Sequence, residues 1–509
     1  MRKAPVRKVP VRKVPVRKAP VRKAPVRKAR REPADAEITI GVDVGTTAVK
    51  AIAVDGRGRV RGRARVAHEV CVADPDSFEH DAAAAWYEGP QRAVAALGPA
   101  ASPAAGLGIA ACVPSLVALG DHLEPLSPGL LYGDWRGRAA AAAWPPASPL
   151  DIREGEAFLH WAAKQWPGAR AYWPAQALAA VALGGEPVID SFTAMSYFPI
   201  FDGRHWDPAE LSRIGVTEDQ LPIVVTEIGA TARSLGGLTR GSARSNGDAD
   251  RAGRTSLAPG GVDVMTEQIT AGVSQPGEAH IMCGTTLLTW AVMPDDGDVP
   301  GLWRFPHRRP GLCLLGGPSN AGGLFLGWAR RLLGGTRART ARRSGLGPGI
   351  DPHPDRIPLW TPYVRGERIP LHNTSVRGSL HGLDLTHDAT ALRRAAYEAT
   401  GFVARRILDM AGCSPSQVVA TGGGTKDRAW MQALADCTGV PVIRAAVPEG
   451  AALGMAWMAR IAAGLESSLD DAARWSRPGR PVYPDERWAR ACSRRYEQFR
   501  ELAAAVRTY

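Results

Sequence analysis

The feature that most constrains this chain is a Gly-Thr-Thr turn that occurs twice, about half the chain apart. The first, Gly45-Thr46-Thr47, follows the apolar stretch 38–44, and Asp43 stands two residues before its glycine. The second is Gly284-Thr285-Thr286. Glycine permits close backbone approach, and successive backbone N–H groups form a concavity that binds anions. Two such turns facing each other across a cleft would hold a phosphate chain, so the repeat indicates ATP chemistry between two lobes.

The sequence has the same organisation around both turns. Residues 38–66 follow a strand–turn–strand–turn–strand pattern, and residues 279–292 repeat a strand–turn–strand unit. Helical patterns follow each unit, at 82–97, 170–183, 389–411 and 451–463. We therefore expect a duplicated α/β lobe.

The length also favours two lobes, because 509 residues exceed what one hydrophobic core usually supports. Two stretches rich in glycine and arginine, 234–259 and 334–354, predict loops. The segments that we expect are a tail (1–35), an N-terminal domain (36–262), a C-terminal domain (263–465) and a helical extension (466–509).

The net charge of +13 comes from the N-terminal tail. Residues 1–31 hold 14 of the 63 Lys and Arg residues and no acid, which leaves 49 basic against 50 acidic residues elsewhere. A repeat of Arg-Lys-Ala/Val-Pro-Val places proline at every fifth position, so we expect an extended, disordered tail. It is either a tether for nucleic acid or another anionic surface, or a dispensable extension. The second alternative is favoured, because the fold signal starts only near Ile38.

The seven cysteines are scattered and form no Cys-x-x-Cys pair, which is typical of reduced thiols and not of a disulfide framework or a zinc site. The sequence contains no run of about 18 apolar residues, so no membrane span is predicted. The N-terminus also lacks the apolar core of a signal peptide. These patterns predict a cytoplasmic protein without a membrane segment. They leave the oligomeric state open, with a homodimer among the alternatives.

Two acids stand where phosphate transfer would need them. Asp43, just before the first turn, can hold Mg²⁺ through water. Asp263 follows the diglycine at 260–261 and precedes the second turn by 21 residues. It either caps a helix or serves as a general base that takes a proton from an attacking hydroxyl, and the residues leave these alternatives even. The cluster Gly422-Gly423-Gly424 lies between an apolar strand and a helix, which suits a nucleotide resting on backbone.

Taken in order, these motifs resemble the FGGY carbohydrate kinases, and among them most closely the xylulose kinases. The resemblance runs from about Ile38 to Leu465. Its main motifs are Asp43-x-Gly-Thr-Thr47, Glu79-His-Asp81, Asp134-x-Arg136, Gly261-x-Asp263, Gly284-Thr-Thr286, Asn320-x-Gly-Gly323, Gly366-Glu-Arg368-x-Pro370 and Gly422-Gly-Gly424. It implies an α/β fold of two duplicated ribonuclease-H-like domains of the actin/hexokinase type, with an inter-domain cleft that closes about a hinge. The sugar would bind mainly to the N-terminal domain and ATP mainly to the C-terminal one.

The resemblance also assigns roles to single residues. It implies that Asp263 is the catalytic base and contacts the substrate, and that Asp43 holds the Mg²⁺ region. Arg368 and Pro370 match motifs that we interpret as architectural, as does Asp190. The residues implied to contact ATP are Thr46, Thr47, Gly284, Thr285, Thr286, Gly322, Gly323, Gly422, Gly423, Gly424 and Lys426.

The chain departs from the family where polar side chains usually contact the sugar. After the strand 106–110 it has Val113 and Pro114, which offer a sugar hydroxyl no hydrogen bond. Xylulose and glycerol are therefore both in question, because polar recognition discriminates such ligands. Asp134 and Trp135 are further candidate sugar contacts, although packing explains Trp135 equally well.

The predicted function is ATP-dependent phosphorylation of a hydroxyl on a sugar or polyol, with a xylulose-like pentulose as the favoured substrate. The alternative is a kinase-like protein that binds nucleotide or sugar as a regulator and has lost useful transfer. Both acids and both turns favour the kinase, whereas the apolar pair Val113 and Pro114 favours the alternative.

Overall fold

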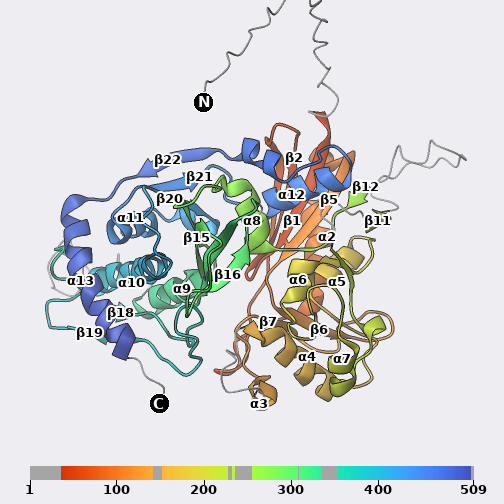
Figure 1. Ribbon diagram of the computed structural model, residues 1–509, viewed down its shortest axis with the longest axis horizontal. Coiled ribbons are helices and arrows are strands. Elements are labelled where there is room, and N and C mark those ends of the chain that lie inside the picture. Colours follow the sequence, from red (N-terminus) through yellow and green to blue (C-terminus); the bar gives the residue numbers. More distant parts are fainter. Residues whose placement is uncertain are drawn as a thin grey trace, which may run out of the picture.

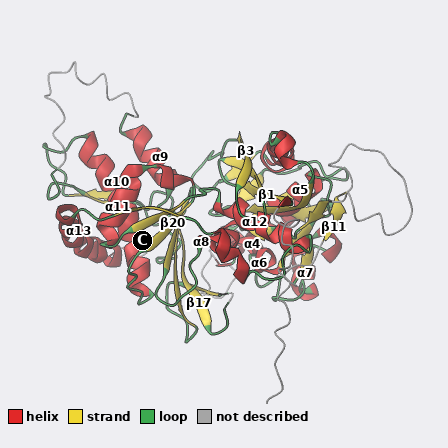
Figure 2. Ribbon diagram, turned by 90° about the horizontal axis from the view of Figure 1, so that it is seen from above, coloured by secondary structure: helices red, strands yellow, loops and turns green. Residues whose placement is uncertain are grey.

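A computed structural model of the chain describes residues 36–141, 152–226, 232–235, 255–307, 309–334 and 353–505. The basic tail and most of the two predicted loops lie outside these residues. The described residues form two lobes side by side, with helix α8 (Asp263–Ala271) between them (Figures 1 and 2). No helix in the described part of the chain is both long and apolar enough to cross a membrane.

The N-terminal lobe is built on a sheet with the strand order β11-β12-β5-β1-β2-β3, in which β13 (Gly261–Val262) also pairs with β5. Its strands are β1 (Ile38–Val44), β2 (Ala48–Val54), β3 (Val60–Ala67), β5 (Ala104–Ala111), β11 (Ala232–Leu235) and β12 (Thr255–Leu257). The two hairpins predicted within 38–66 are confirmed, because β1, β2 and β3 pair antiparallel in sequence. Strands β1 and β2 are mostly buried, whereas β3 alternates because one face of this edge strand meets solvent.

The C-terminal lobe repeats this topology. Its sheet has the order β16-β17-β15-β14-β20-β21-β22. In both lobes a first strand, β1 or β14, pairs antiparallel with the next strand along the chain and parallel with a later one, β5 or β20. The strands are β14 (Ala279–Cys283), β15 (Leu287–Pro294), β16 (Trp303–Pro306), β17 (Leu312–Ser319), β20 (Val418–Thr421), β21 (Val442–Ala445) and β22 (Pro478–Val482). The predicted duplication is confirmed, and it places the two Gly-Thr-Thr turns in equivalent hairpins.

Smaller elements complete both lobes. In the N-terminal lobe a four-stranded sheet has the order β4 (Glu79–His80), β7 (Gly129–Leu131), β6 (Ser115–Leu119) and β8 (Ala171–Trp173). Strands β9 (Val188–Asp190) and β10 (Ile223–Val225) form a separate pair. The helices of this lobe are α2 (Gly89–Ala95), α3 (Arg138–Ala141), α4 (Glu154–Gln165), α5 (Ala175–Ala182), α6 (Ser191–Met195) and α7 (Pro208–Ile214). In the C-terminal lobe the smaller elements are the pair β18 (Leu359–Thr361) and β19 (Ser379–His381) and helices α9 (Gly323–Leu332), α10 (Ala389–Met410), α11 (Arg428–Thr438) and α13 (Glu486–Ala505).

The helix predicted over 170–183 is only partly present. Strand β8 occupies its first residues, and α5 begins after Pro174. Proline has no backbone N–H to donate but suits the start of a helix, so it separates the two elements. The helical prediction was therefore wrong for residues 170–174.

Helix α12 (Gly450–Ala462) comes late in the sequence, yet it packs against the sheet of the N-terminal lobe (Figure 1). A Cβ atom on Gly41 of β1 would lie 1.7 Å from the Ala452 carbonyl oxygen, and one on Gly106 of β5 would lie 2.5 Å from the Ala459 oxygen. Glycines in the strands thus let the helix backbone touch the sheet. The segment 263–465 therefore contributes one helix to the other lobe.

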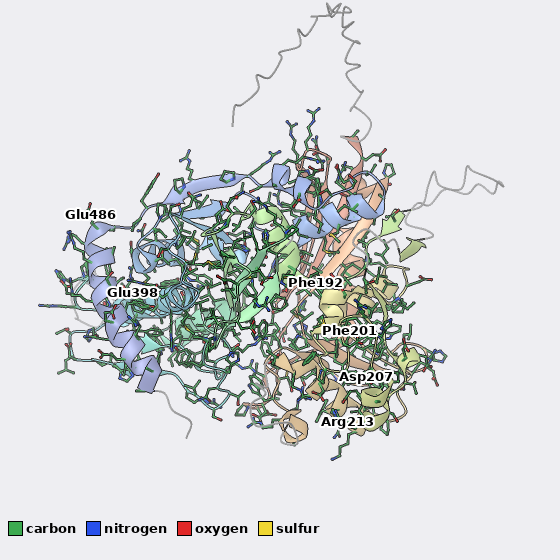
Figure 3. The ribbon with its side chains drawn as sticks, in the orientation of Figure 1. Phe192, Phe201, Asp207, Arg213, Glu398 and Glu486 are labelled. Carbon is green, nitrogen blue, oxygen red and sulfur yellow. The ribbon has the colours of Figure 1, made fainter. Side chains whose placement is uncertain are left out.

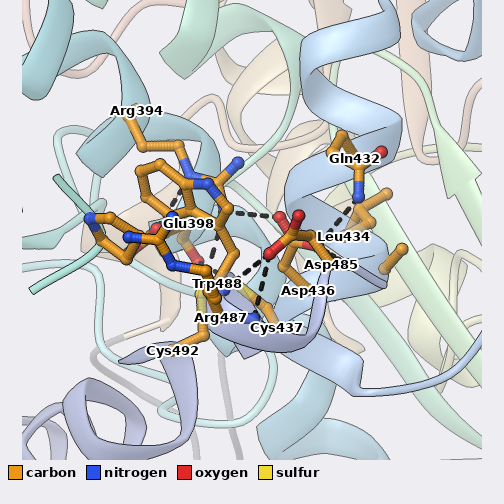
Figure 4. A network of polar contacts seen from close by, with 12 residues as sticks. Arg394, Glu398, Gln432, Leu434, Asp436, Cys437, Asp485, Arg487, Trp488 and Cys492 are labelled. Carbon is orange, nitrogen blue, oxygen red and sulfur yellow. Dashed lines mark hydrogen bonds and ion pairs between the residues drawn. The ribbon is translucent and has the colours of Figure 1, made fainter. Parts of the chain in front are cut away.

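The extension 466–509, described to Ala505, contacts both lobes: Trp475 Nε1 donates to the Gly56 oxygen of the N-terminal lobe at 3.2 Å, and from β22 on the chain belongs to the C-terminal lobe. We expected it to be helical, and α13 is, but β22 adds a strand beside β21. A buried polar network fixes the extension (Figure 4): Arg394 Nη2 donates to Asp436 Oδ2 at 2.7 Å, and Asp436 Oδ1 accepts from the Asp485 N–H at 2.8 Å. Arg495 of α13 donates to Glu398 of α10 at 2.8 Å.

Candidate active site

A cavity of about 500 Å³ opens between the two lobes. Its walls come from the β1–β2 and β14–β15 turns, the β5–β6 connection, helices α6 and α8, strand β16 and the turn after β20. Eleven of the predicted site residues line it: Asp43, Thr46, Thr47, Val113, Pro114, Asp263, Gly284, Thr285, Thr286, Gly422 and Gly423. The other six, Asp134, Trp135, Gly322, Gly323, Gly424 and Lys426, are not among its lining residues. Both Gly-Thr-Thr turns therefore open into one space.

The first turn is held by a buried chain of side chains. The Trp86 indole N–H donates to His80 Nδ1 at 2.9 Å, so the proton of the neutral imidazole sits on Nε2 and is donated to the Thr46 carbonyl oxygen at 2.8 Å. Burial, together with the neighbouring His68, lowers the pKa of His80 to about 4, which keeps the ring neutral. The Thr46 hydroxyl hydrogen-bonds the Tyr132 hydroxyl at 2.8 Å. The hydroxyl and the carbonyl oxygen of Thr46 therefore both have partners, whereas Thr47 is exposed to the cavity.

Asp43 has a lysine partner that the sequence analysis missed. In the β1–β2 hairpin Asp43 is opposite Lys50, and Lys50 Nζ lies 2.7 Å from Asp43 Oδ2. The Asp43 carboxylate raises the pKa of Lys50, with smaller contributions from Glu267 and Asp263. Lys50 therefore offsets part of the negative charge of three carboxyl groups that line the cavity.

Asp263 is the first residue of α8 and follows β13, which pairs parallel with β5. Its Oδ1 accepts from the Val264 N–H at 2.8 Å. Burial raises the pKa of the Asp263 carboxyl to about 7, and the charge of Asp43 adds to the shift, while Lys50 and Arg368 oppose it. A carboxyl group with a pKa near neutrality is suited to accept a proton at physiological pH.

Glu267 is a second residue that the sequence analysis missed. It lies one turn after Asp263 on α8 and lines the same cavity. It is 4% exposed, and its Oε1 is a buried oxygen without a hydrogen-bond partner among the described residues. Burial raises the pKa of Glu267 to about 8, and Asp43 adds to the shift. With Asp43, it supplies the carboxylate oxygens that Mg²⁺ prefers, and one or two carboxylates together with phosphates are the usual Mg²⁺ site.

The second turn is held by backbone. The Gly284 N–H donates to the Thr286 oxygen at 3.1 Å, and the first residues of α9, Gly323 and Leu324, donate their N–H groups to the oxygens of Gly284 and Thr285, each at 2.9 Å. A Cβ on Gly322 would lie 2.3 Å from the Thr286 carbonyl carbon. Gly322 and Gly323 thus support the turn from behind.

The third glycine cluster follows β20. Gly422 has φ = +85°, and a Cβ there would lie 2.8 Å from the Cys283 oxygen, so the chain passes directly behind the end of β14. Gly422 and Gly423 line the cavity next to the second turn. Lys426 is exposed at the end of the following helical turn, outside the cavity wall.

The two candidate sugar contacts in 134–135 have structural partners. Asp134 accepts from the Phe78 N–H at 2.8 Å and from Arg136 Nη2 at 2.6 Å. Trp135 is 3% exposed and packs in the interior. Arg368, which we interpreted as architectural, does line the cavity, and its Nη2 lies 3.5 Å from Glu154 of the other lobe.

Two family models match the chain: the N-terminal domain of the FGGY family of carbohydrate kinases over residues 38–148, and its C-terminal domain over residues 279–463. Together they cover more than half of the chain.

Several curated relatives are sugar kinases. The xylulose kinase of Escherichia coli (strain K12) is 26% identical over 91% of this chain and 98% of its own length. The gluconokinase of Bacillus subtilis (strain 168) is 24% identical over 85% of this chain and 88% of its own length. The match to the xylulose kinase of the same Bacillus strain is 28% identical but spans 55% of this chain and only 56% of that protein. The relatives thus differ in the substrate that their names give.

The fold has close counterparts among solved structures. The crystal structure of a xyloylose kinase from Brucella ovis superposes with a TM-score of 0.72 at 24% identity, over 92% of this chain and 99% of the other. The likeness confirms the predicted fold class, two ribonuclease-H-like domains with a cleft between them.

Proposed function

Because this chain belongs to the FGGY family of carbohydrate kinases, we propose that it transfers the γ-phosphate of ATP·Mg²⁺ to a hydroxyl of a sugar or polyol, with a xylulose-like pentulose as the first compound to test. The observation that carries the proposal is that Asp263 and both Gly-Thr-Thr turns line one cavity. A general base and two phosphate-binding turns are what an in-line phosphoryl transfer requires.

In this proposal Asp263 orients the acceptor hydroxyl and takes its proton as the oxygen attacks. The pKa of about 7 lets the carboxylate bind the proton during transfer and release it afterwards. Lys50 and Arg368 keep part of the carboxyl population charged, because each lowers the pKa of Asp263. Such a base typically contributes about 10²- to 10⁴-fold to the rate.

The two turns hold the phosphate chain with backbone N–H groups and the exposed hydroxyl of Thr47. Asp43 and Glu267 would hold Mg²⁺, directly or through water, and the ion would neutralise charge on the phosphate oxygens. Gly422 and Gly423 leave room for a nucleotide to lie against backbone beside the second turn. Closure of the lobes would exclude water from the reacting hydroxyl.

We also propose that the protein works in the cytoplasm, since its seven cysteines are all free thiols. The homodimer and a nucleic-acid contact of the tail stay predictions, because the tail lies outside the described residues and the structure contains one chain.

The test is ADP release by the full chain with ATP, Mg²⁺ and a panel of ketoses, aldoses and polyols, with Asp263→Asn run alongside. We expect at least one compound to stimulate release, and the variant to lose about 10²- to 10⁴-fold in kcat while still binding ATP. Retained ATP binding separates a lost base from a misfolded variant. If no compound stimulates the wild-type protein although it binds ATP, the regulator that binds nucleotide without transfer replaces this proposal.

A further inference from the structure

The N-terminal lobe presents an apolar wall to the cavity. The wall consists of Val113 and Pro114 from the β5–β6 connection and of Phe192, Met195 and Phe198 from α6 and the turn after it. Figure 3 shows Phe192 on the side of this lobe that faces the other lobe. These five side chains carry no group that donates or accepts a strong hydrogen bond.

The five side chains of the wall differ in their exposure. Pro114 is buried, Val113 and Phe192 are half-buried, and Met195 and Phe198 are 37% and 44% exposed. Large apolar side chains left open to water in this way are a feature of binding sites, because covering them is favourable. The wall lies in the same cavity as Asp263, so one small substrate can contact both.

Two hydroxyl groups that line the cavity already have hydrogen-bond partners. The Ser196 hydroxyl donates to the Thr193 oxygen at 2.7 Å, and the Tyr132 hydroxyl is bonded to Thr46 at 2.8 Å. On the opposite side Arg368 is 3% exposed, and among the described residues its Nε is a buried donor without a hydrogen-bond partner. Among the described residues the buried donors without a hydrogen-bond partner that line the cavity are Arg368 Nε, Trp290 Nε1 and Trp303 Nε1, all from the C-terminal lobe, and none of them belongs to the wall.

We propose that the substrate of this kinase is a small hydroxylated compound whose end remote from the transferred hydroxyl is apolar, a methyl or other alkyl group, and that this end lies against Val113, Pro114, Phe192, Met195 and Phe198. The proposal rests on the kinase function proposed above and narrows its substrate class. A fully hydroxylated pentulose would place an unpaired hydroxyl against this wall.

The size of the effect follows from general recognition energetics. A buried hydroxyl without a partner is costly, and one methyl group in an apolar pocket changes specificity by roughly 10- to 200-fold. We therefore expect replacement of the remote hydroxyl by hydrogen or methyl to raise kcat/KM about tenfold or more.

The first experiment compares D-xylulose with its 1-deoxy and 5-deoxy derivatives in the ADP-release assay with the full chain. Whichever terminal hydroxyl receives the phosphate, one of the two derivatives keeps it and has a methyl group at the other end. We expect the derivative that keeps the phosphorylated hydroxyl to have a kcat/KM about tenfold higher than that of D-xylulose. If D-xylulose is the better substrate than both derivatives, the proposal is overturned.

A matched pair of variants locates the effect. Met195→Gln puts an amide of similar length into the wall, whereas Leu385→Gln makes the same kind of change at a fully exposed leucine outside the cavity. Met195→Gln is expected to reverse or abolish the preference for the deoxy compound, and Leu385→Gln to leave it unchanged. An unaltered preference in Met195→Gln would show that the apolar end lies elsewhere.

Calorimetric titration measures the binding affinity of the same three compounds independently of turnover, so the inference on the apolar end can be tested apart from the kinase function. If the protein binds a deoxy compound about tenfold more tightly than D-xylulose but shows no turnover, the binding role of the apolar wall is supported and the kinase function is contradicted. If the protein turns over its ligands and prefers D-xylulose, the kinase function is supported and the binding role of the wall is contradicted. Equal binding of all three compounds also overturns the inference.

Discussion

The two Gly-Thr-Thr turns have the same sequence and the same place in their hairpins, but the protein holds them in different ways. Side chains far away in the sequence fix the first turn: His80 bonds the Thr46 carbonyl and Tyr132 bonds the Thr46 hydroxyl. Backbone N–H groups at the start of α9 fix the second. A local motif thus specifies the shape of a turn, whereas its support depends on the surrounding lobe.

The turns also differ in charge. Asp43, Lys50, Asp263 and Glu267 interact with one another beside the first turn. Asp43 and Lys50 flank the first turn in the sequence, whereas residues 281–288 around the second turn hold no charged side chain. We infer that proton transfer and metal binding take place beside the first turn, and that the second turn serves only to position the phosphates.

Among the variants that change the support or the charge of the turns, Gly322→Ala is expected to have the largest effect, because it disrupts the backbone support of the second turn. The new Cβ would lie 2.3 Å from the Thr286 carbonyl carbon, and because the obstacle is backbone the turn itself must move. A displacement of about 1 Å in a positioning element costs roughly 10²-fold in activity. Steady-state kinetics should show kcat/KM for ATP lowered by about that factor.

Gly327→Ala, inside α9, is the control for Gly322→Ala at the residue that precedes this helix. Its Cβ would meet only the end of the Arg331 side chain at 3.7 Å, and alanine favours a helix over glycine. We expect it to leave the kinetics unchanged and the melting temperature equal or higher. Equal kinetics for the two variants would mean that α9 does not hold the turn.

The next largest effect concerns the side-chain support of the first turn. His80→Phe keeps a flat ring but leaves the Trp86 N–H and the Thr46 oxygen without partners, and each unpaired buried group costs about 1–3 kcal/mol. Urea unfolding should show a free energy of unfolding lower by at least that amount. Folding lowers the pKa of His80 from 6.5 to about 4, so near pH 6 the unfolded chain binds a proton that the folded protein does not. The loss should therefore be largest at pH 8 and smaller by roughly 0.8 kcal/mol at pH 6. A loss that grows toward pH 6 would contradict the neutral imidazole assigned to His80.

Lys50→Met tests the charge contrast. The Lys50 cation lowers the pKa of Asp263, so its removal should raise that pKa above about 7. The base must be unprotonated to act, and the acid limb of the pH profile of kcat/KM should therefore move to higher pH. A shift of one pH unit lowers activity about tenfold at pH 6 and leaves it nearly unchanged well above pH 8. A profile that is uniformly lower, with the same midpoint, would show that Lys50 acts on something other than Asp263.

Two of the missed residues had a signal in the sequence. A tight turn at 45–47 places Asp43 opposite Lys50 across the hairpin, as the register of β1 and β2 confirms. Glu267 follows Asp263 by four residues, which puts both on one helix face. Strand alternation, turn glycines and helical periodicity are local, and for that reason the hairpins and the duplication could be predicted.

Other features had no local signal. Nothing near Thr46 in the sequence points to His80 or Tyr132, whose contacts arise only when the small sheet docks on the large one. The small residues of α12 predict close packing but not against which lobe, and α12 crosses to the N-terminal sheet. The partners of Asp134, the Arg136 guanidinium and the Phe78 N–H, likewise had no local signal, and its contact with the sugar stays a prediction.

The smallest effect is expected from Tyr132→Phe, which should change the KM for ATP with little loss of stability. Tyr132→Phe removes only the hydroxyl that bonds Thr46, for which about 0.5–1.5 kcal/mol of unfolding free energy is typical. Tyr172→Phe is its match, since Tyr172 donates to the Trp166 oxygen at 2.6 Å in the same lobe but outside the cavity. Urea unfolding should rank the two variants close together. Only Tyr132→Phe should raise KM for ATP, because it alone frees the first turn to move, and an unchanged KM would mean that backbone holds both turns. Burial raises the pKa of Tyr132 far above the physiological range, so this effect should not depend on pH, in contrast to that of Lys50→Met.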